Sequence, residues 1–156
     1  MLRVSRSWVN MTSIKGKVLI IDDEKSVIDA SKDILEQAGF EVHMFHENVD
    51  SMDQLTDLLS NTHFDTVVTD RGMIRCNGIQ LARSIRDTAG VNQDTPIVMQ
   101  TAFFDKATEL EARNAGIYRV ITKNNLRDKS PPNDSELFRA VNDAITEKGK
   151  SGFKKE

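Results

Sequence analysis

The chain has 156 residues and a formal net charge of -3, with 38% hydrophobic and 29% charged residues. This length favours a single soluble domain with a real core, and the charge gives no indication of nucleic acid or an anionic membrane as a direct partner. No apolar run is long enough to cross a bilayer, and residues 1–10 lack the apolar stretch of a secretory signal.

Predicted strands and helices alternate along the chain. Short apolar β-branched runs are typical of strands covered on both faces, and apolar residues at 3.6-residue spacing indicate helices. Gly39 stands at the C-cap of the first helix, Asp105 is a candidate N-cap of the fourth, and Ser135 or Asp134 caps the fifth. The elements expected in chain order are strand 18–21, helix 27–38, strand 41–46, helix 52–59, strand 66–69, helix 79–85, strand 97–99, helix 105–116, strand 118–122 and helix 137–145.

This alternation predicts a three-layer α/β/α sandwich around a five-stranded parallel sheet. The two more polar strands, 41–46 and 118–122, suit positions near the sheet edges. We expect a flexible extension over residues 1–16, one domain over 17–148 and a tail over 149–156. Residues 124–134 contain Pro131-Pro132 and are expected to form a surface loop. The single cysteine, Cys76, fits a reducing, cytoplasmic setting.

Polar side chains follow four of the predicted strands, at the edge where open parallel sheets bind ligands. Taken singly, each has an ordinary explanation, since aspartates cap helices and most lysines are solvated. Their placement at equivalent strand ends favours a shared site. These residues are Asp22, Asp23 and Glu24 after the first strand, Asp70 after the third, Thr101 after the fourth and Lys123 after the fifth.

The combination has a chemical logic. Carboxylates held together need a cation, and oxygen ligands with retained waters suit Mg²⁺. An ionised carboxylate such as Asp70 beside that metal can attack phosphorus and give an acyl phosphate. The Lys123 ammonium would offset charge on the transferring oxygens, and the Thr101 hydroxyl would hydrogen-bond one of them.

These residues resemble the receiver domain of two-component response regulators, from about Lys17 to Ile145. The order and spacing of the matching segments are specific, although no single segment would be. The segments are Val18-Leu19-Ile20-Ile21-Asp22-Asp23-Glu24, Val67-Val68-Thr69-Asp70-Arg71-Gly72-Met73 with Gly78, Thr101-Ala102 and Thr122-Lys123.

The resemblance implies the flavodoxin-like receiver fold with strand order 2-1-3-4-5. It also implies that Asp70 accepts a phosphoryl group from a histidine kinase or phosphotransfer protein, and that Thr101 and Lys123 contact the phosphate. The implied Mg²⁺ ligands are the Asp23 and Asp70 carboxylates and the Gly72 carbonyl, with Asp22 supporting the metal's water shell. Such a domain is a phosphoacceptor that signals to a downstream protein, as a monomer or weak homodimer, and is not a turnover enzyme.

Several positions depart from the family pattern. Ile74 and Asn124 stand where prolines are usual, so the customary cis peptide before residue 124 is not expected. Val120 replaces the usual aromatic switch residue, and Tyr118 lies on the same strand face by alternation. We therefore expect intact phosphoryl chemistry with atypical output, and we hypothesise that Phe103 shields the phosphorylation pocket from water.

Two other functions remain open. A receiver-like protein-binding module that works without phosphorylation is favoured slightly by the missing aromatic and prolines. A phosphatase with an aspartyl-phosphate intermediate is weaker, because such enzymes generally place a second acid two residues after the nucleophile, where this chain has Gly72.

Overall fold

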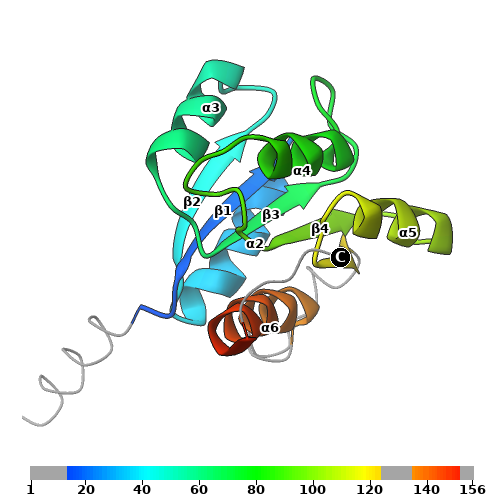
Figure 1. Ribbon diagram of the computed structural model, residues 1–156. Coiled ribbons are helices and arrows are strands. Elements are labelled where there is room, and N and C mark those ends of the chain that lie inside the picture. The colour runs from blue at the N-terminus through cyan, green and yellow to red at the C-terminus, as the bar shows by residue number, and fades with distance from the viewer. Residues whose placement is uncertain (1–13, 124–134, 152–156) are drawn as a thin grey trace, which may run out of the picture.

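Five parallel strands form one sheet in the order β2-β1-β3-β4-β5 (Figure 1), as predicted. The computed structural model describes residues 14–123 and 135–151. The strands are β1 (Lys17–Asp22), β2 (Glu41–His46), β3 (Thr66–Asp70), β4 (Ile97–Thr101) and β5 (Arg119–Thr122). The helices are α2 (Lys25–Gln37), α3 (Met52–Asn61), α4 (Gly78–Asp87), α5 (Lys106–Asn114) and α6 (Glu136–Ser151).

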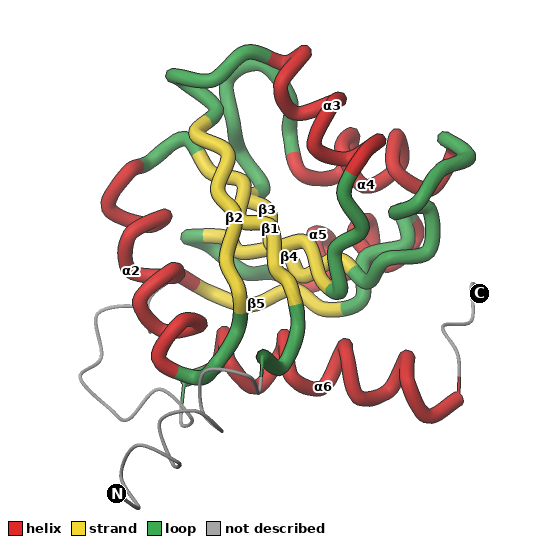
Figure 2. Tube along the Cα trace, turned by 90° about the vertical axis from the view of Figure 1, so that its left-hand side faces the viewer, coloured by secondary structure: helices red, strands yellow, loops and turns green. Residues whose placement is uncertain are grey.

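Helices cover both faces of this sheet (Figure 2). Two apolar clusters fill the two interfaces. Successive strand residues point to opposite faces, so each strand contributes side chains to both clusters. Leu19 and Val67 face α3, α4 and α5, whereas Val18 and Val68 face α2 and α6. Strands β3 and β4 are buried along their whole length, whereas the edge strands β2 and β5 are only partly buried. The predicted three-layer architecture is confirmed.

The ends of the helices follow local signals. Gly39 has φ 102° after α2, a conformation that favours glycine. The Asp105 side chain accepts a 2.7 Å hydrogen bond from the Thr108 backbone N–H at the start of α5. Ser135, one of the two candidate caps of α6, accepts a 2.9 Å bond from the Phe138 N–H. These features set where α2 ends and where α5 and α6 begin.

One sequence-based expectation differs from the structure. Tyr118 packs against the α2/α6 cluster and Val120 against the opposite one, so they do not share a face. The reason is that β5 begins at Arg119, which leaves Tyr118 outside the regular alternation. In α5 the buried positions are Thr108 and Ala112.

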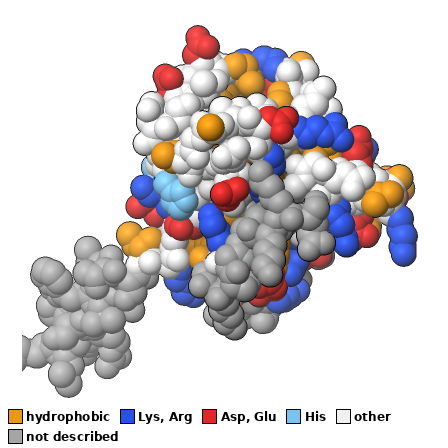
Figure 3. Space-filling model, viewed as in Figure 1, with side chains coloured by type: hydrophobic (Ala, Val, Ile, Leu, Met, Phe, Trp, Pro, Cys, Tyr) orange, Lys and Arg blue, Asp and Glu red, His pale blue; other side chains and the backbone are white. Residues whose placement is uncertain are grey.

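Some expectations fall outside the described residues. They are residues 1–13 of the extension predicted over 1–16, the loop over 124–134 with its peptide bond before residue 124, the Asp134 cap and residues 152–156 of the predicted tail. Within the described ranges, no helix has the length and apolar character needed to cross a membrane. Acidic and basic side chains are mixed over the face shown in Figure 3.

Candidate functional site

The acidic residues predicted to meet do so at the carboxyl edge of the sheet. Asp22 ends β1, Asp70 ends β3, and Asp23 follows Asp22 in the connection to α2. One carboxylate oxygen from each lies within 4.8 Å of those from the other two. Asp22 and Asp70 are buried and Asp23 is half-buried. The neighbouring parallel strands β1 and β3 therefore carry their terminal carboxylates into one pocket.

Lys123 reaches this pocket from the edge strand β5, which lies two strands away from β3 in the sheet. Its position follows β5, and its Nζ lies 2.9 Å from Asp70 Oδ1 and 3.2 Å from Asp22 Oδ2. The Lys123 side chain is only 12% exposed. One ammonium group thus partly neutralises two buried carboxylates, which would otherwise repel each other.

The electrostatics of the pocket follow from burial and crowding. Burial and the nearby Asp70 carboxylate raise the pKa of Asp22 to about 6. Burial also raises the pKa of Asp70, although the hydrogen bond and positive charge of Lys123 oppose the effect. Burial acts to lower the pKa of Lys123, but the bond to Asp70 and the attraction of Asp22 outweigh it, so that pKa is raised. The site therefore has a surplus of negative charge.

The donor set fits a hard divalent cation. Asp22 Oδ1 accepts a 2.9 Å bond from the Glu24 backbone N–H. Asp22 Oδ2 is buried without a hydrogen-bond donor in good geometry among the described residues, and its neighbour Lys123 pairs with it by charge. Carboxylate oxygens in surplus over positive charge are what Mg²⁺ binds. Gly72 is exposed, with open space around it.

The connection from β3 to α4 is held close to the site. The Arg71 N–H donates to the Gln100 carbonyl at 3.0 Å, and the Gly78 N–H donates to the Arg71 carbonyl at 2.8 Å. A Cβ at Gly78 would lie 2.4 Å from the Asp70 carbonyl oxygen. Only glycine permits this approach, so Gly78 sets how closely α4 follows the candidate phosphoacceptor.

Comparisons with known proteins identify the family. The model of the response regulator receiver domain matches residues 18–130. The chain belongs to this family.

Curated response regulators are similar to part of this chain. Transcriptional regulatory protein CpxR of Escherichia coli (strain K12) is 31% identical over 87 residues, 56% of this chain and 34% of that protein. Response regulator MprA of Mycobacterium sp. (strain KMS) is 28% identical over 100 residues, 64% of this chain and 40% of that protein. The match thus spans about a third to two fifths of these curated relatives.

A CheY-like response regulator receiver domain protein from Methanospirillum hungatei JF-1 has the same fold. Its crystal structure superposes with a TM-score of 0.69 at 22% identity, covering 90% of this chain and all of that chain (100%).

Thr101 of this receiver domain lies at the site edge, but its hydroxyl is engaged locally. It donates to the Phe103 carbonyl at 3.0 Å and accepts from the Phe103 N–H at 3.3 Å. Phe103 itself is 72% exposed. In this conformation, therefore, the Thr101 hydroxyl is bonded to its own loop and not to Asp70.

Glu24 lies at the predicted edge of the receiver domain, although its sequence position predicts no role for it. Its Oε1 lies 3.7 Å from Lys123 Nζ, so three acids approach one ammonium group. The sequence signal for Glu24 is its position directly after two aspartates at a strand end. A further buried acid, Glu47, lies in the loop after β2, and its sequence context carries no signal for this place.

Proposed function

We propose that this receiver domain accepts a phosphoryl group on Asp70 from the phosphohistidine of a histidine kinase or phosphotransfer protein. The observation that carries the proposal is the meeting of Asp70 with Lys123 Nζ at 2.9 Å beside Asp22 and Asp23. The domain acts as a cytoplasmic phosphoacceptor for a downstream protein target, as a monomer or weak homodimer. It is not a turnover enzyme and does not itself bind nucleic acid.

The chemistry assigns a task to each residue. A carboxylate oxygen of Asp70 forms a bond to phosphorus while the phosphorus–nitrogen bond breaks, and the electron pair of that bond leaves with the imidazole. Asp22, Asp23, Asp70 and the Gly72 carbonyl would hold Mg²⁺, which supplies positive charge for the transferring oxygens. Lys123 adds its ammonium charge on the other side of Asp70. Thr101 would leave Phe103 to hydrogen-bond the phosphoryl group.

Intact mass measurement tests this assignment. We expect the protein with Mg²⁺ and acetyl phosphate to gain one phosphoryl adduct that hydroxylamine removes. Asp70→Asn should lose the adduct, whereas Asp57→Asn, at an exposed carboxyl on α3, should keep it. An adduct that persists in Asp70→Asn would refute the site. Rapid turnover of unrelated phosphate esters would instead favour a phosphatase.

A phosphorylation-independent binding module is the second candidate. It is favoured by Val120, which packs against the apolar cluster at the position of the usual aromatic switch. The same mass measurement separates the two functions, because a wild-type protein without any adduct would favour the binding module.

A further inference from the structure

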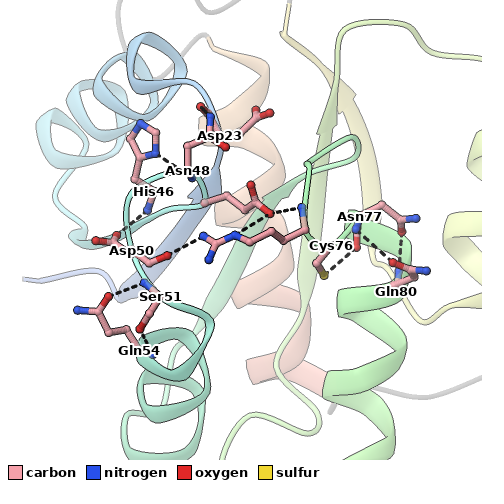
Figure 4. A network of polar contacts seen from close by, with 11 residues as sticks. Asp23, His46, Asn48, Asp50, Ser51, Gln54, Cys76, Asn77 and Gln80 are labelled. Atoms are coloured by element: carbon pink, nitrogen blue, oxygen red, sulfur yellow. Dashed lines mark hydrogen bonds and ion pairs between the residues drawn. The ribbon is translucent and has the colours of Figure 1, made fainter.

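The connection between β3 and α4, residues 71–77, carries the Gly72 carbonyl that the proposed Mg²⁺ site uses. Its two ends are fixed by the backbone bonds of Arg71 and Gly78 described above. Its middle is fixed by a different segment, the turn between β2 and α3, residues 47–51. Figure 4 shows polar side chains of both segments pointing toward one another.

Glu47 is the centre of this contact. It directly follows β2, is 1% exposed, and its backbone N–H donates to the Asp22 carbonyl at 2.9 Å. Its carboxylate Oε2 accepts a hydrogen bond from the Arg75 backbone N–H and lies 3.5 Å from Arg75 Nε. One residue thus joins the backbone that carries Asp22 to the loop that carries Gly72.

Arg75 and Asn48 extend the contact on both sides. Arg75 Nη2 donates to the Asp50 carbonyl at 2.6 Å, so the arginine spans the 47–51 turn. Asn48 Nδ2 donates to the Asp23 carbonyl at 3.1 Å. The turn is therefore bonded to the backbone of both aspartates and, through Arg75, to the loop after Asp70.

Burying Glu47 is costly for the fold. Its Oε1 is buried without a hydrogen-bond partner among the described residues, and its partner Arg75 has a side chain that is 38% exposed. A buried carboxylate with one unsatisfied oxygen costs stability whatever its role, so a positioning role would account for its place here. The contact is also placed next to Ile74, where the receiver pattern usually has a proline that would stiffen the loop.

We propose that Glu47 and Arg75 form a latch that holds the 71–77 loop against the Asp22 backbone and so fixes the Gly72 carbonyl for Mg²⁺. Both are positioning residues, because neither belongs to the carboxylate cluster itself. The effect on Mg²⁺ binding rests on the proposed function, whereas the contact between Glu47 and the loop does not. Outer-shell partners of metal ligands typically change metal affinity by 10- to 100-fold, and a backbone carbonyl ligand places this effect at the low end.

The test measures two quantities in the full chain: Mg²⁺ affinity by calorimetric titration, and hydrogen exchange of the loop amides without metal. Glu47→Ala should weaken Mg²⁺ binding about tenfold and speed exchange at residues 72–77. Arg75→Ala removes a half-exposed side chain and should not prevent folding. It should also weaken Mg²⁺ binding and speed loop exchange, each by less than Glu47→Ala does. Glu47→Gln keeps an acceptor for the Arg75 N–H and should fall between wild type and Glu47→Ala.

Asn92→Ala is the matched control. The buried Asn92 side chain accepts a hydrogen bond from the Phe64 N–H and donates to the Leu59 and Thr62 carbonyls. It lies just before β4, at the edge of the sheet opposite the carboxylate cluster. The substitution should lower the melting temperature while leaving Mg²⁺ affinity and loop exchange unchanged.

The outcomes distinguish the two hypotheses. If Glu47→Ala and Arg75→Ala keep wild-type affinity and loop exchange, the latch is overturned, whatever they do to stability. If wild type itself binds no Mg²⁺, the proposed function is overturned, and loop exchange in the metal-free variants still decides whether the latch exists.

Discussion

Asp22 and Asp70 share one ammonium group, that of Lys123. Nζ lies nearer to Asp70, at 2.9 Å, than to Asp22, at 3.2 Å. Asp22 is fully buried. Its ionisation costs more free energy than in water, because the carboxylate is desolvated and faces the Asp70 carboxylate. The charge state of these carboxylates therefore contributes to the free energy of unfolding in a way that depends on pH.

The pKa of Asp22 rises on folding from 3.8 to about 6, so the folded protein binds more protons than the unfolded chain between these values. The free energy of unfolding from this group should therefore fall as pH rises from about 4 to about 6. Without divalent cations, Asp22→Asn should raise the free energy of unfolding at pH 7.5 by about 1 to 3 kcal/mol. The gain should disappear near pH 4.

Urea unfolding in EDTA at both pH values measures this difference. Asp57→Asn, which changes an exposed carboxyl, should stay within about 0.5 kcal/mol of wild type at both. A less stable Asp22→Asn at pH 7.5 in EDTA would show that Asp22 contributes more through Lys123 than it costs by burial.

The start of α4 depends on one glycine. A Cβ at Gly78 would meet the Asp70 carbonyl oxygen at 2.4 Å and Met99 Sδ at 3.1 Å. Gly78→Ala should lower the free energy of unfolding by about 1 to 3 kcal/mol, the cost of overpacking a dense site. Propensity alone predicts the opposite sign, since alanine favours helix over glycine.

Denaturant midpoints of Gly78→Ala and Gly90→Ala provide the comparison. A Cβ at Gly90 would meet no atom within 4 Å, so that variant should remain within about 0.5 kcal/mol of wild type. Equal midpoints for the two variants would mean that α4 shifts freely away from Asp70.

The sequence was sufficient for the strand ends and insufficient for side-chain directions. Asp22, Asp70 and Lys123 could be brought together from sequence because parallel strands share one carboxyl edge. Tyr118 was placed on the wrong face because a one-residue change in where a strand begins reverses its alternation. The local bonds of the Thr101 hydroxyl and the burial of Glu47 depend on loop conformation, which apolar periodicity does not encode.

Val120 leads to a prediction about β5. It packs against the cluster under α4 and α5, and it has no ring or hydroxyl to swing between two positions. On phosphorylation, NMR shifts at Val120 should be smaller than those around Asp70. Backbone amide spectra with Mg²⁺ and acetyl phosphate measure both. Shifts at Val120 as large as those at Asp70 would contradict atypical output through this strand.

The site joins elements that are distant in sequence. Asp22 is the last residue of β1, Asp70 is the last residue of β3, and Lys123 follows β5. On the α2 side, Gln100 Nε2 also donates to Ser31 Oγ at 3.3 Å, which ties β4 to α2 beneath the pocket. A ligand that bridges these strand ends should therefore stabilise the entire fold and not one loop.

Mg²⁺ is the proposed ligand, and its effect on unfolding follows from mass action. A cation that binds only the folded chain should add about 2.7 kcal/mol to the free energy of unfolding at 100 times its dissociation constant. Asp23→Asn, which removes a half-buried carboxylate of the cluster, should abolish most of this gain, while Asp57→Asn should retain it. Thermal melts across a Mg²⁺ series, at constant ionic strength set with NaCl, separate specific binding from screening. A wild-type melting temperature that does not respond to Mg²⁺ would exclude a metal site at these strand ends, because the three clustered carboxylates would then gain nothing from the cation.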